Sequence, residues 1–318
     1  MTARSLSGIQ PSGRLHLGNY FGAIRQHIAK QDDAFYFIAN YHAQTTVFDA
    51  ETLRRYTLET AASYLALGLD PERATLFRQS DVPQVTELMW LLTSVTGKGL
   101  LDRAVSYKDR VAQGVTPSLG LYMYPVLMAA DILAYDSDIV PVGSDQVQHI
   151  EMCRDMAGSF NNRYGDTFKI PDYEIGTPVP VKGVDGRKMS KSYDNTIPIF
   201  DTAKALKKKV MSITTDSKGL DEPKDPDTCN VFDMYKLMAS EEELETMAAN
   251  YRRGGYGYGA AKKELLRLIN ETFGDATERY FALLNTPDDI EDALQKGAEK
   301  ARAAATKVLN RARAASGL

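Results

Sequence analysis

Two segments far apart in the chain carry residues suited to binding phosphate groups. The first extends from Gly8 to Asn19, where strand-like residues lead into a Pro and Gly turn and then into His-Leu-Gly-Asn at the start of a helix. Glycine lets a backbone approach a ligand closely, and a helix N-terminus presents free N–H groups to phosphate. His16 and Asn19 add side-chain donors. The same residues would also fit a simple turn with an incidental histidine, so this segment alone favours neither interpretation.

The second segment, Asp185 to Ser192, contains two lysines three positions apart, Lys188 and Lys191, with small hydroxyl residues beside them. On a loop, such residues can wrap a triphosphate and place ammonium groups where negative charge develops in a transition state. A charged surface loop is the common alternative. The order Lys-Met-Ser-Lys-Ser is much less common, and it favours phosphate chemistry.

A third candidate is an acidic residue within an apolar helix. Tyr124, Met128, Asp131 and Tyr135 are spaced so that they share one helix face. A buried carboxylate is costly unless a donor pairs with it. The donor for Asp131 could be a ligand N–H such as that of an indole ring, or an arginine or a helix N-terminus inside the protein. From the residues alone the internal donor is favoured.

These residues need a scaffold, and the first two-thirds of the chain predicts one by alternating strands and helices. Strands are expected over 35–39, 74–77 and 138–142, and helices over 53–67, 87–96 and 147–160. This alternation predicts an α/β fold, a Rossmann-like doubly wound parallel sheet covered on both faces. Ligands gather at the carboxyl ends of such strands, where Gly143, Ser144, Asp145 and Gln146 follow the strand 138–142.

After residue 200 the strand signals end. A capping box at Ser240–Glu243 predicts one helix, a second is expected over 260–273, and a third begins near Thr286. We predict domains 1–200 (catalytic) and 201–318 (all-helical), with a terminal helix over about 288–318 that could pack back on the first domain. Basic clusters at 204–209 and 296–313 are each best interpreted as solvated helix faces, although an RNA contact would use the same composition.

Composition excludes several classes of protein. The 318 residues carry a formal net charge of −4, which argues against bulk electrostatic capture of nucleic acid and against a DNA-binding role. Two cysteines and four histidines form no disulfide framework and no zinc pattern, so no bound metal is expected. No apolar run approaches the roughly 20 residues that span a bilayer, and the first residues lack a signal-peptide pattern. We therefore expect a cytoplasmic protein without a membrane partner.

Taken together, the motifs resemble those of class I aminoacyl-tRNA synthetases. His16-Leu17-Gly18-Asn19 resembles the HIGH signature with Asn in the last place, and residues 188–192 match the KMSKS signature in full. Their order and separation also fit. More narrowly, the segments 8–13, 128–133 and 141–149 are similar to bacterial members of the family that activate tryptophan. The resemblance covers nearly the whole chain.

The resemblance implies a set of site residues. Catalytic roles fall to Lys188, Lys191, His16 and Asn19. ATP contacts fall to Gln10, Pro11, Ser12, Gly18, Asn19, Arg110, Gly143, Ser144, Asp145, Lys188, Met189, Ser190, Lys191 and Ser192. Tryptophan contacts fall to Gly8, His42, Tyr124, Met128, Asp131, Val140, Val142 and Gln146. In this set Asp131 reads the indole nitrogen, Tyr124 and Gln146 meet the ammonium group, and His42 approaches the carboxylate.

The implied reaction has two steps. L-Tryptophan attacks the α-phosphate of ATP, with Mg²⁺ bound through the ATP phosphates, and the tryptophanyl group then passes to the 3′ end of tRNA(Trp). The resemblance also implies a homodimer and tRNA binding by the helical domain, and the chain length leaves no room for an editing domain. The alternatives are a tyrosine-activating enzyme of the same fold, a cofactor-building nucleotidyltransferase, and a paralogue without activity. Trp90, the only tryptophan, is interpreted as a core or interface residue.

Overall fold

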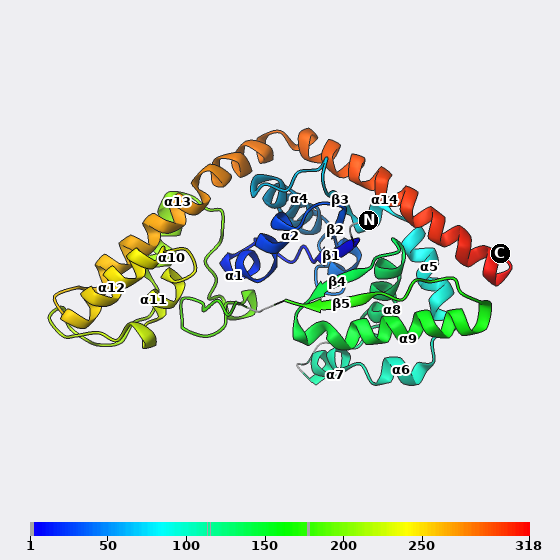
Figure 1. The fold of residues 1–318 in the computed structure, drawn as a ribbon, viewed down its shortest axis with the longest axis horizontal. Helices are drawn as coiled ribbons and strands as arrows, with labels where there is room; N and C mark the ends of the chain where they lie inside the picture. The colour runs from blue at the N-terminus through cyan, green and yellow to red at the C-terminus, as the bar shows by residue number, and fades with distance from the viewer. Residues whose placement is uncertain (1–2, 113, 115, 177–178) are drawn as a thin grey trace.

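A computed structural model describes residues 3–112, 114, 116–176 and 179–318, and its centre is a five-stranded sheet (Figure 1). The strands are β1 (Ser5–Ile9), β2 (Ala34–Ile38), β3 (Thr75–Arg78), β4 (Ile139–Val142) and β5 (Asp172–Ile175). Their spatial order is β3-β2-β1-β4-β5, and every pairing is parallel. The order reverses between β1 and β4, which places the topological switch point there.

Both faces of this sheet are covered, as the predicted doubly wound architecture requires. All five residues of β2 are buried, which is the pattern of a strand packed on both sides. Tyr36 and Ile38 belong to one hydrophobic cluster, while Phe35 and Phe37 belong to the cluster on the opposite face. The α/β prediction is confirmed.

Helices surround the sheet and connect its strands. A helical run follows β1 as α1 (Leu17–Asn19), a π-helical turn (Tyr20–Ile24) and α2 (Arg25–Ala29). The others in this part are α3 (Asn40–Ala43), α4 (Ala50–Ala66), α5 (Gln84–Thr93), α6 (Lys98–Asp102), α7 (Val105–Ala112), α8 (Leu119–Leu133) and α9 (Val147–Tyr164). The strands β1 and β4 thus both end in short turns that lead into helices, and these turns form the rim where the site lies.

One detail of the predicted elements is wrong, and one of the two alternatives for Trp90 is excluded. Helix α8 ends at Leu133, so Tyr135 does not share its face. Tyr135 lies in the following turn and stacks on Phe35 with 5.3 Å between ring centroids. Trp90, on α5, is 70% exposed and is therefore not a core residue.

The described residues in the second part of the chain form helices joined by loops, the longest of them over 212–225, and no strand. Its elements are α10 (Ala203–Met211), α11 (Asn230–Tyr235), α12 (Glu241–Arg253), α13 (Tyr258–Asn285) and α14 (Pro287–Ser316). The predicted capping box is present at α12, where Ser240 Oγ accepts from Glu243 N and the Glu243 carboxylate accepts from Ser240 N. Helix α13 begins earlier and ends later than its prediction, because its apolar stripe continues through Phe273 to Tyr280.

Helix α14 runs back across the first part and packs on the edge strand β3 (Figure 1). Gly297 makes this approach possible, since a Cβ there would lie 1.8 Å from the Leu76 carbonyl oxygen. Ion pairs Arg78–Glu291 and Arg313–Glu87 hold the helix along its length. Among the described residues, no helix is both long and apolar enough to cross a membrane.

Candidate active site

The turn after β1 is built around His16, the N-cap residue of α1. Its backbone is extended (φ −127°, ψ 169°), and its N–H donates to Asn19 Oδ1 at 3.1 Å. The His16 ring is buried, and this burial, with Lys191 nearby, lowers the pKa of His16 to about 4. The imidazole is therefore neutral near pH 7 and can offer one N–H and one acceptor nitrogen, but no fixed charge.

The loop 185–192 is shaped by Asn195, a buried residue that the sequence analysis did not single out. Asn195 Oδ1 accepts from Ser190 N at 2.8 Å, while Nδ2 donates to Asp185 Oδ1 at 2.7 Å and to the Lys188 carbonyl at 3.0 Å. One side chain thus binds the loop at three points. A single asparagine after the lysine motif carries no periodic or spacing signal that could have identified it.

The two phosphate-binding candidates lie against each other. Lys191 Nζ donates to the Gly13 carbonyl at 2.9 Å and to Ser12 Oγ at 3.4 Å, and Gly18 N–H donates to Met189 Sδ at 3.4 Å. Burial lowers the pKa of Lys191 to about 8. Segments separated by more than half of the chain therefore form one structure, with the Lys191 ammonium at its centre.

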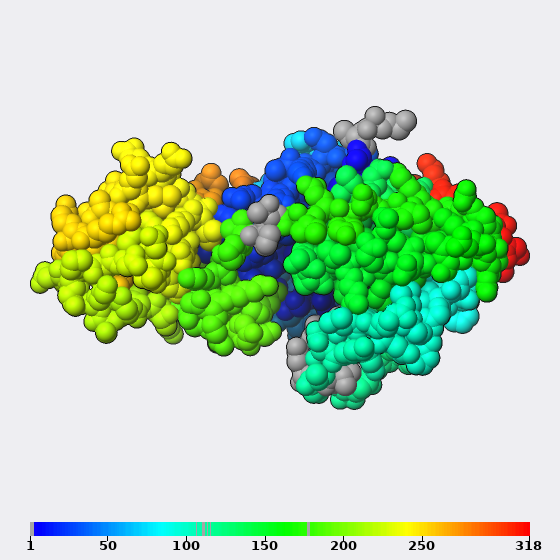
Figure 2. All heavy atoms as spheres, turned by 60° about the horizontal axis from the view of Figure 1, so that its bottom comes forward, coloured from blue at the N-terminus to red at the C-terminus, as the bar shows by residue number. Residues whose placement is uncertain are grey.

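A cavity of about 620 Å³ opens beside this junction, and we call it the α2-side cavity. Its wall from the first helical run includes Gly18, Gly22 and His27, and its opposite wall includes Gly143, Asp145, Val181 and Lys188. In the space-filling view the dark-blue N-terminal residues lie at the floor of a hollow between the green and the yellow-green parts of the surface (Figure 2). Lys188 thus faces a cavity that the glycines of both turns leave open.

A second cavity of about 570 Å³, the α8-side cavity, lies on the other side of β1. Its lining includes Gly8, Gln10, Phe37, His42, Tyr124, Met128, Val140, Gln146, His149 and Ser192. Ser7 lines both cavities. The two spaces therefore both border Ser7, the middle residue of β1, next to the carboxyl end of the strand where open α/β sheets bind their ligands.

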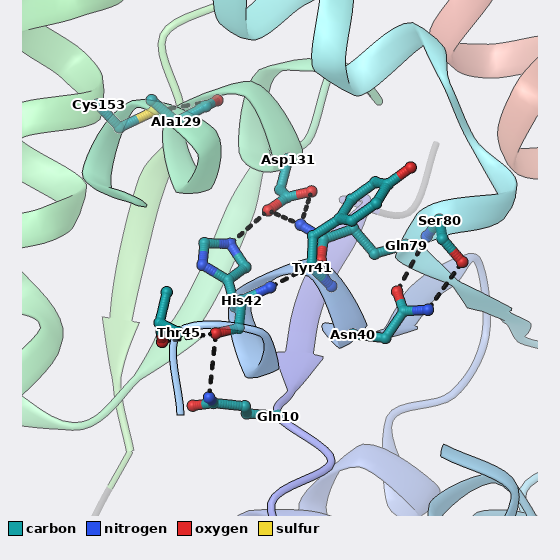
Figure 3. A network of polar contacts seen from close by, with 10 residues as sticks. All are labelled: Gln10, Asn40, Tyr41, His42, Thr45, Gln79, Ser80, Ala129, Asp131 and Cys153. Carbon is teal, nitrogen blue, oxygen red and sulfur yellow. Dashed lines mark hydrogen bonds and ion pairs between the residues drawn. The ribbon is translucent and has the colours of Figure 1, made fainter. Parts of the chain in front are cut away.

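Asp131 is 1% exposed and lies behind the wall of the α8-side cavity, where it is bonded to His42, a residue that lines the cavity (Figure 3). Gln79 Nε2 donates to Asp131 Oδ1 at 2.9 Å and to Oδ2 at 2.8 Å, and His42 Nε2 donates to Oδ2 at 2.9 Å. The internal donor expected from the residues alone, an arginine or a helix N-terminus, is wrong: its partners are an amide and an imidazole. Burial raises the pKa of Asp131, and the hydrogen bonds from His42 and Gln79 oppose this rise.

Tyr124 and His149 form a second polar pair in the same cavity. The distance between Tyr124 Oη and His149 Nε2 is 2.8 Å, and burial lowers the pKa of His149. Tyr124 was expected as a site residue from the sequence, whereas His149 was not. The only sequence signal for His149 was its position, about one helical turn after residues 143–146.

Some predicted residues lie apart from their expected neighbours. Val142 lines the α2-side cavity and not the α8-side cavity, whereas Ser192 and Gln10, expected at ATP, line the α8-side cavity. Ser144 and Gln146 belong to a 3₁₀ turn after β4 (Ser144–Gln146), and Pro11 is buried in the turn after β1. The side chain of Arg110 lies outside the described residues. No group of three potential metal-ligating side chains occurs within the part of the chain that the structure describes.

Comparisons with known proteins agree on one family. The family model described as "tRNA synthetases class I (W and Y)" matches residues 2–274. The tryptophan–tRNA ligase of Rhodopirellula baltica is 53% identical over 99% of both chains, and that of Fusobacterium nucleatum is 51% identical over 99% of this chain and 98% of its own. The crystal structure of tryptophanyl-tRNA synthetase from Campylobacter jejuni complexed with ADP and tryptophan has a TM-score of 0.95 and 48% identity, covering 99% of this chain and all of its own.

Proposed function

Because the chain belongs to the class I tRNA synthetases for tryptophan and tyrosine, we propose that it activates L-tryptophan with ATP and transfers the tryptophanyl group to tRNA(Trp). The observation that carries this proposal is the junction of residues 12–18 with residues 188–191, close to two cavities that both border Ser7. A reaction that joins two small molecules through a phosphate needs this arrangement.

ATP occupies the α2-side cavity, with its adenosine against Gly143 and Asp145 and its phosphates at Gly18 and the loop 188–192. Position 18 has no room for a side chain, since a Cβ there would lie 2.9 Å from His16 Nδ1. Glycine therefore leaves its backbone open to the phosphates. Lys188 and Lys191 supply positive charge from two sides of the junction. Mg²⁺ arrives bound to the ATP phosphates, where it would withdraw charge from the phosphate oxygens.

Tryptophan occupies the α8-side cavity with its carboxylate directed toward β1. A carboxylate oxygen forms a bond to the α-phosphorus, the bond to the bridging oxygen of the β-phosphate breaks, and pyrophosphate leaves. A hydroxyl of the 3′-terminal adenosine of tRNA then attacks the carbonyl carbon, the ester bond forms, and AMP and the hydroxyl proton leave. No covalent enzyme intermediate is formed. This chain contributes positioning and preorganised charge, which are the main sources of rate in phosphoryl chemistry.

Recognition of the side chain rests on Asp131, which accepts the indole N–H, while Met128 and Val140 line the ring. Tyr124 and Gln146 face the ammonium group. His42, expected near the tryptophan carboxylate, is bonded to Asp131 and so also contributes to the indole end. A site built to pair an N–H group rejects side chains that lack it without an editing step.

The helical elements α10–α13 hold the anticodon region of tRNA, and the protein acts in the cytoplasm as a homodimer. Trp90, exposed on α5, is an aromatic side chain of the kind that a subunit interface covers. Light scattering should give twice the chain mass of 35.2 kDa. A single-chain mass at micromolar concentration would contradict the dimer without affecting the reaction proposed.

The test of the function is amino-acid-dependent ATP–pyrophosphate exchange with tryptophan and tyrosine compared. We expect exchange with tryptophan only. Exchange driven by tyrosine would transfer the assignment to the tyrosine-activating branch of the family. Exchange with neither amino acid would leave a cofactor-building nucleotidyltransferase or a binding protein without activity as the alternatives.

A further inference from the structure

Gln79 begins the 3₁₀ turn after β3 (Gln79–Asp81), and it is fully buried although its side chain is polar. It does not line either cavity. Its amide joins two elements beside the amino-acid site, α3 through Tyr41 and His42, and α8 through Asp131 (Figure 3). We propose that Gln79 is a positioning residue that holds Asp131 as the acceptor for the indole N–H and thereby sets the preference for tryptophan. This inference rests on the function proposed above.

The orientation of the Gln79 amide is fixed by its backbone partners. Oε1 accepts from Tyr41 N at 3.0 Å and from His42 N at 3.4 Å. An amide oxygen cannot donate and an amide NH₂ cannot accept, so the NH₂ group must face Asp131. A flipped amide would put its NH₂ against two N–H donors and its oxygen against a carboxylate. The chain therefore presents a donor, and only a donor, to Asp131 from this side.

This donor distinguishes the two oxygens of Asp131. Oδ2 accepts from both Gln79 Nε2 and His42 Nε2, while Oδ1 accepts from Gln79 Nε2 alone. Each carboxylate oxygen has about two acceptor positions. Gln79 and His42 together donate two hydrogen bonds to Oδ2 and one to Oδ1. Oδ1 is therefore the oxygen with an acceptor position left for a ligand N–H. Because Gln79 contacts both oxygens, it also sets the rotation of the carboxylate about its bond to Cβ.

The position of Asp131 agrees with this role. Met128, one turn before it on α8, and Ile132, the next residue in the sequence, both line the α8-side cavity, as does His42, which is bonded to Asp131. Asp131 is thus one layer behind the cavity surface and Gln79 is a second layer behind it. A buried carboxylate without donors would favour its protonated form, which presents an O–H in place of an acceptor. Gln79 acts on the substrate only through Asp131.

The experiment compares L-tryptophan with the analogue in which sulfur replaces the indole N–H (the benzothiophene side chain), using ATP–pyrophosphate exchange. The wild-type ratio of kcat/KM should favour tryptophan by roughly 10- to 100-fold, the effect of one hydrogen bond to a charged acceptor. In Gln79→Met the ratio should fall by about tenfold, mainly through KM for tryptophan, with KM for ATP unchanged. The ratio is independent of the fraction of enzyme that is folded.

Two further variants separate positioning from stability. Gln79→Glu keeps an acceptor for Tyr41 and His42, and beside the Asp131 carboxylate it donates only while the two carboxyl groups share a proton. Its discrimination should therefore fall as the pH rises and that proton is lost, even if Gln79→Met folds poorly. Gln31→Met is the matched control, since Gln31 is also buried and also joins two segments, accepting from Asp70 N and donating to the Gly68 carbonyl. It should lower the unfolding temperature and leave the substrate ratio at the wild-type value.

The outcomes are distinguishable. Equal use of both substrates by the wild type would overturn the role of Asp131 and this inference with it, while tryptophan activation itself would stand. Wild-type discrimination that both Gln79 variants retain would overturn the positioning role alone. Absence of exchange with either substrate would contradict the proposed function, on which the inference depends.

Discussion

The ammonium group of Lys191 joins the two phosphate-binding segments, so its removal is the sharpest change at the scale of one residue. Lys191→Ala should reduce tryptophan-dependent pyrophosphate exchange by roughly 10²- to 10³-fold, because a preorganised charge is lost where negative charge develops. Lys207→Ala, at an exposed lysine on α10, is the control and should leave the rate unchanged. An unchanged rate in Lys191→Ala would remove Lys191 from the catalytic machinery.

The pH dependence of the same residue gives a second readout. The pKa of Lys191 is lowered to about 8 by burial, so its charged form predominates below that pH and is lost above it. In the free enzyme, kcat/KM for ATP should therefore fall as pH rises through about 8. His16, whose pKa is about 4, stays neutral across this range, so it adds no second pH-dependent change to kcat/KM. Lys191→Ala should lack the alkaline limb, and Lys191→Arg should shift it to higher pH.

Gly18 permits the close approach of the two segments and of a nucleotide. A methyl group at this position would lie 2.9 Å from His16 Nδ1 and 3.5 Å from Met189 Cβ, within the α2-side cavity. Gly18→Ala should raise KM for ATP by about tenfold or more, since the added group costs on the order of 1–3 kcal/mol in a packed site. Gly274→Ala in α13, where nothing lies within 4 Å, is the matched control in the same kinetic assay.

At the scale of elements, α14 owes its position on β3 to one glycine. Gly297→Ala should destabilise the protein by roughly 1–3 kcal/mol or more, because the new methyl group overlaps the Leu76 carbonyl oxygen. Gly274→Ala should instead stabilise by about 0.5–1 kcal/mol, the usual gain for alanine within a helix. The midpoints of urea unfolding compare the two. If Gly297→Ala and Gly274→Ala unfolded at the same urea concentration, α14 would have to shift to accommodate the methyl group at little cost in stability.

The elements also show what the sequence can and cannot predict. Strands β2 and β3 were predictable because they are apolar runs between turns, and α12 because its capping box is local. Strand β5 was not, since Asp172 and Glu174 lie at an exposed edge and produce no hydrophobic pattern. The site residues divide in the same way, into those that a local pattern predicts and those that it does not. His16, Lys188 and Lys191 belong to motifs. Gln79 instead acts through hydrogen bonds to α3 and α8, and Asn195 through hydrogen bonds to the loop before it, and no pattern along the chain encodes either.

At the scale of the whole molecule, the two basic clusters lie on different sides of the fold. The cluster on α10 is next to the loop 188–195, because Lys209 Nζ lies 3.8 Å from Asp194 Oδ1. The cluster on α14 lies on the helix that covers β3, the edge strand. We expect a tRNA whose 3′ end reaches the junction of residues 12–18 with residues 188–191 to pass the first cluster, because that cluster borders the loop 188–195, and the second cluster to lie off that path. Only the α10 cluster is therefore expected to contact tRNA.

Charge reversal tests this assignment in the complete enzyme. Combining Lys204→Glu, Lys207→Glu and Lys208→Glu, all at exposed positions, should lower kcat/KM for tRNA at least tenfold, because each lost phosphate contact weakens binding and flattens its salt dependence. Pyrophosphate exchange should stay unchanged, since it needs no tRNA. The matched control combines Lys296→Glu and Lys300→Glu on α14 and should affect neither reaction. If instead the α14 pair impairs aminoacylation and the α10 triple does not, tRNA approaches across the opposite side of the molecule.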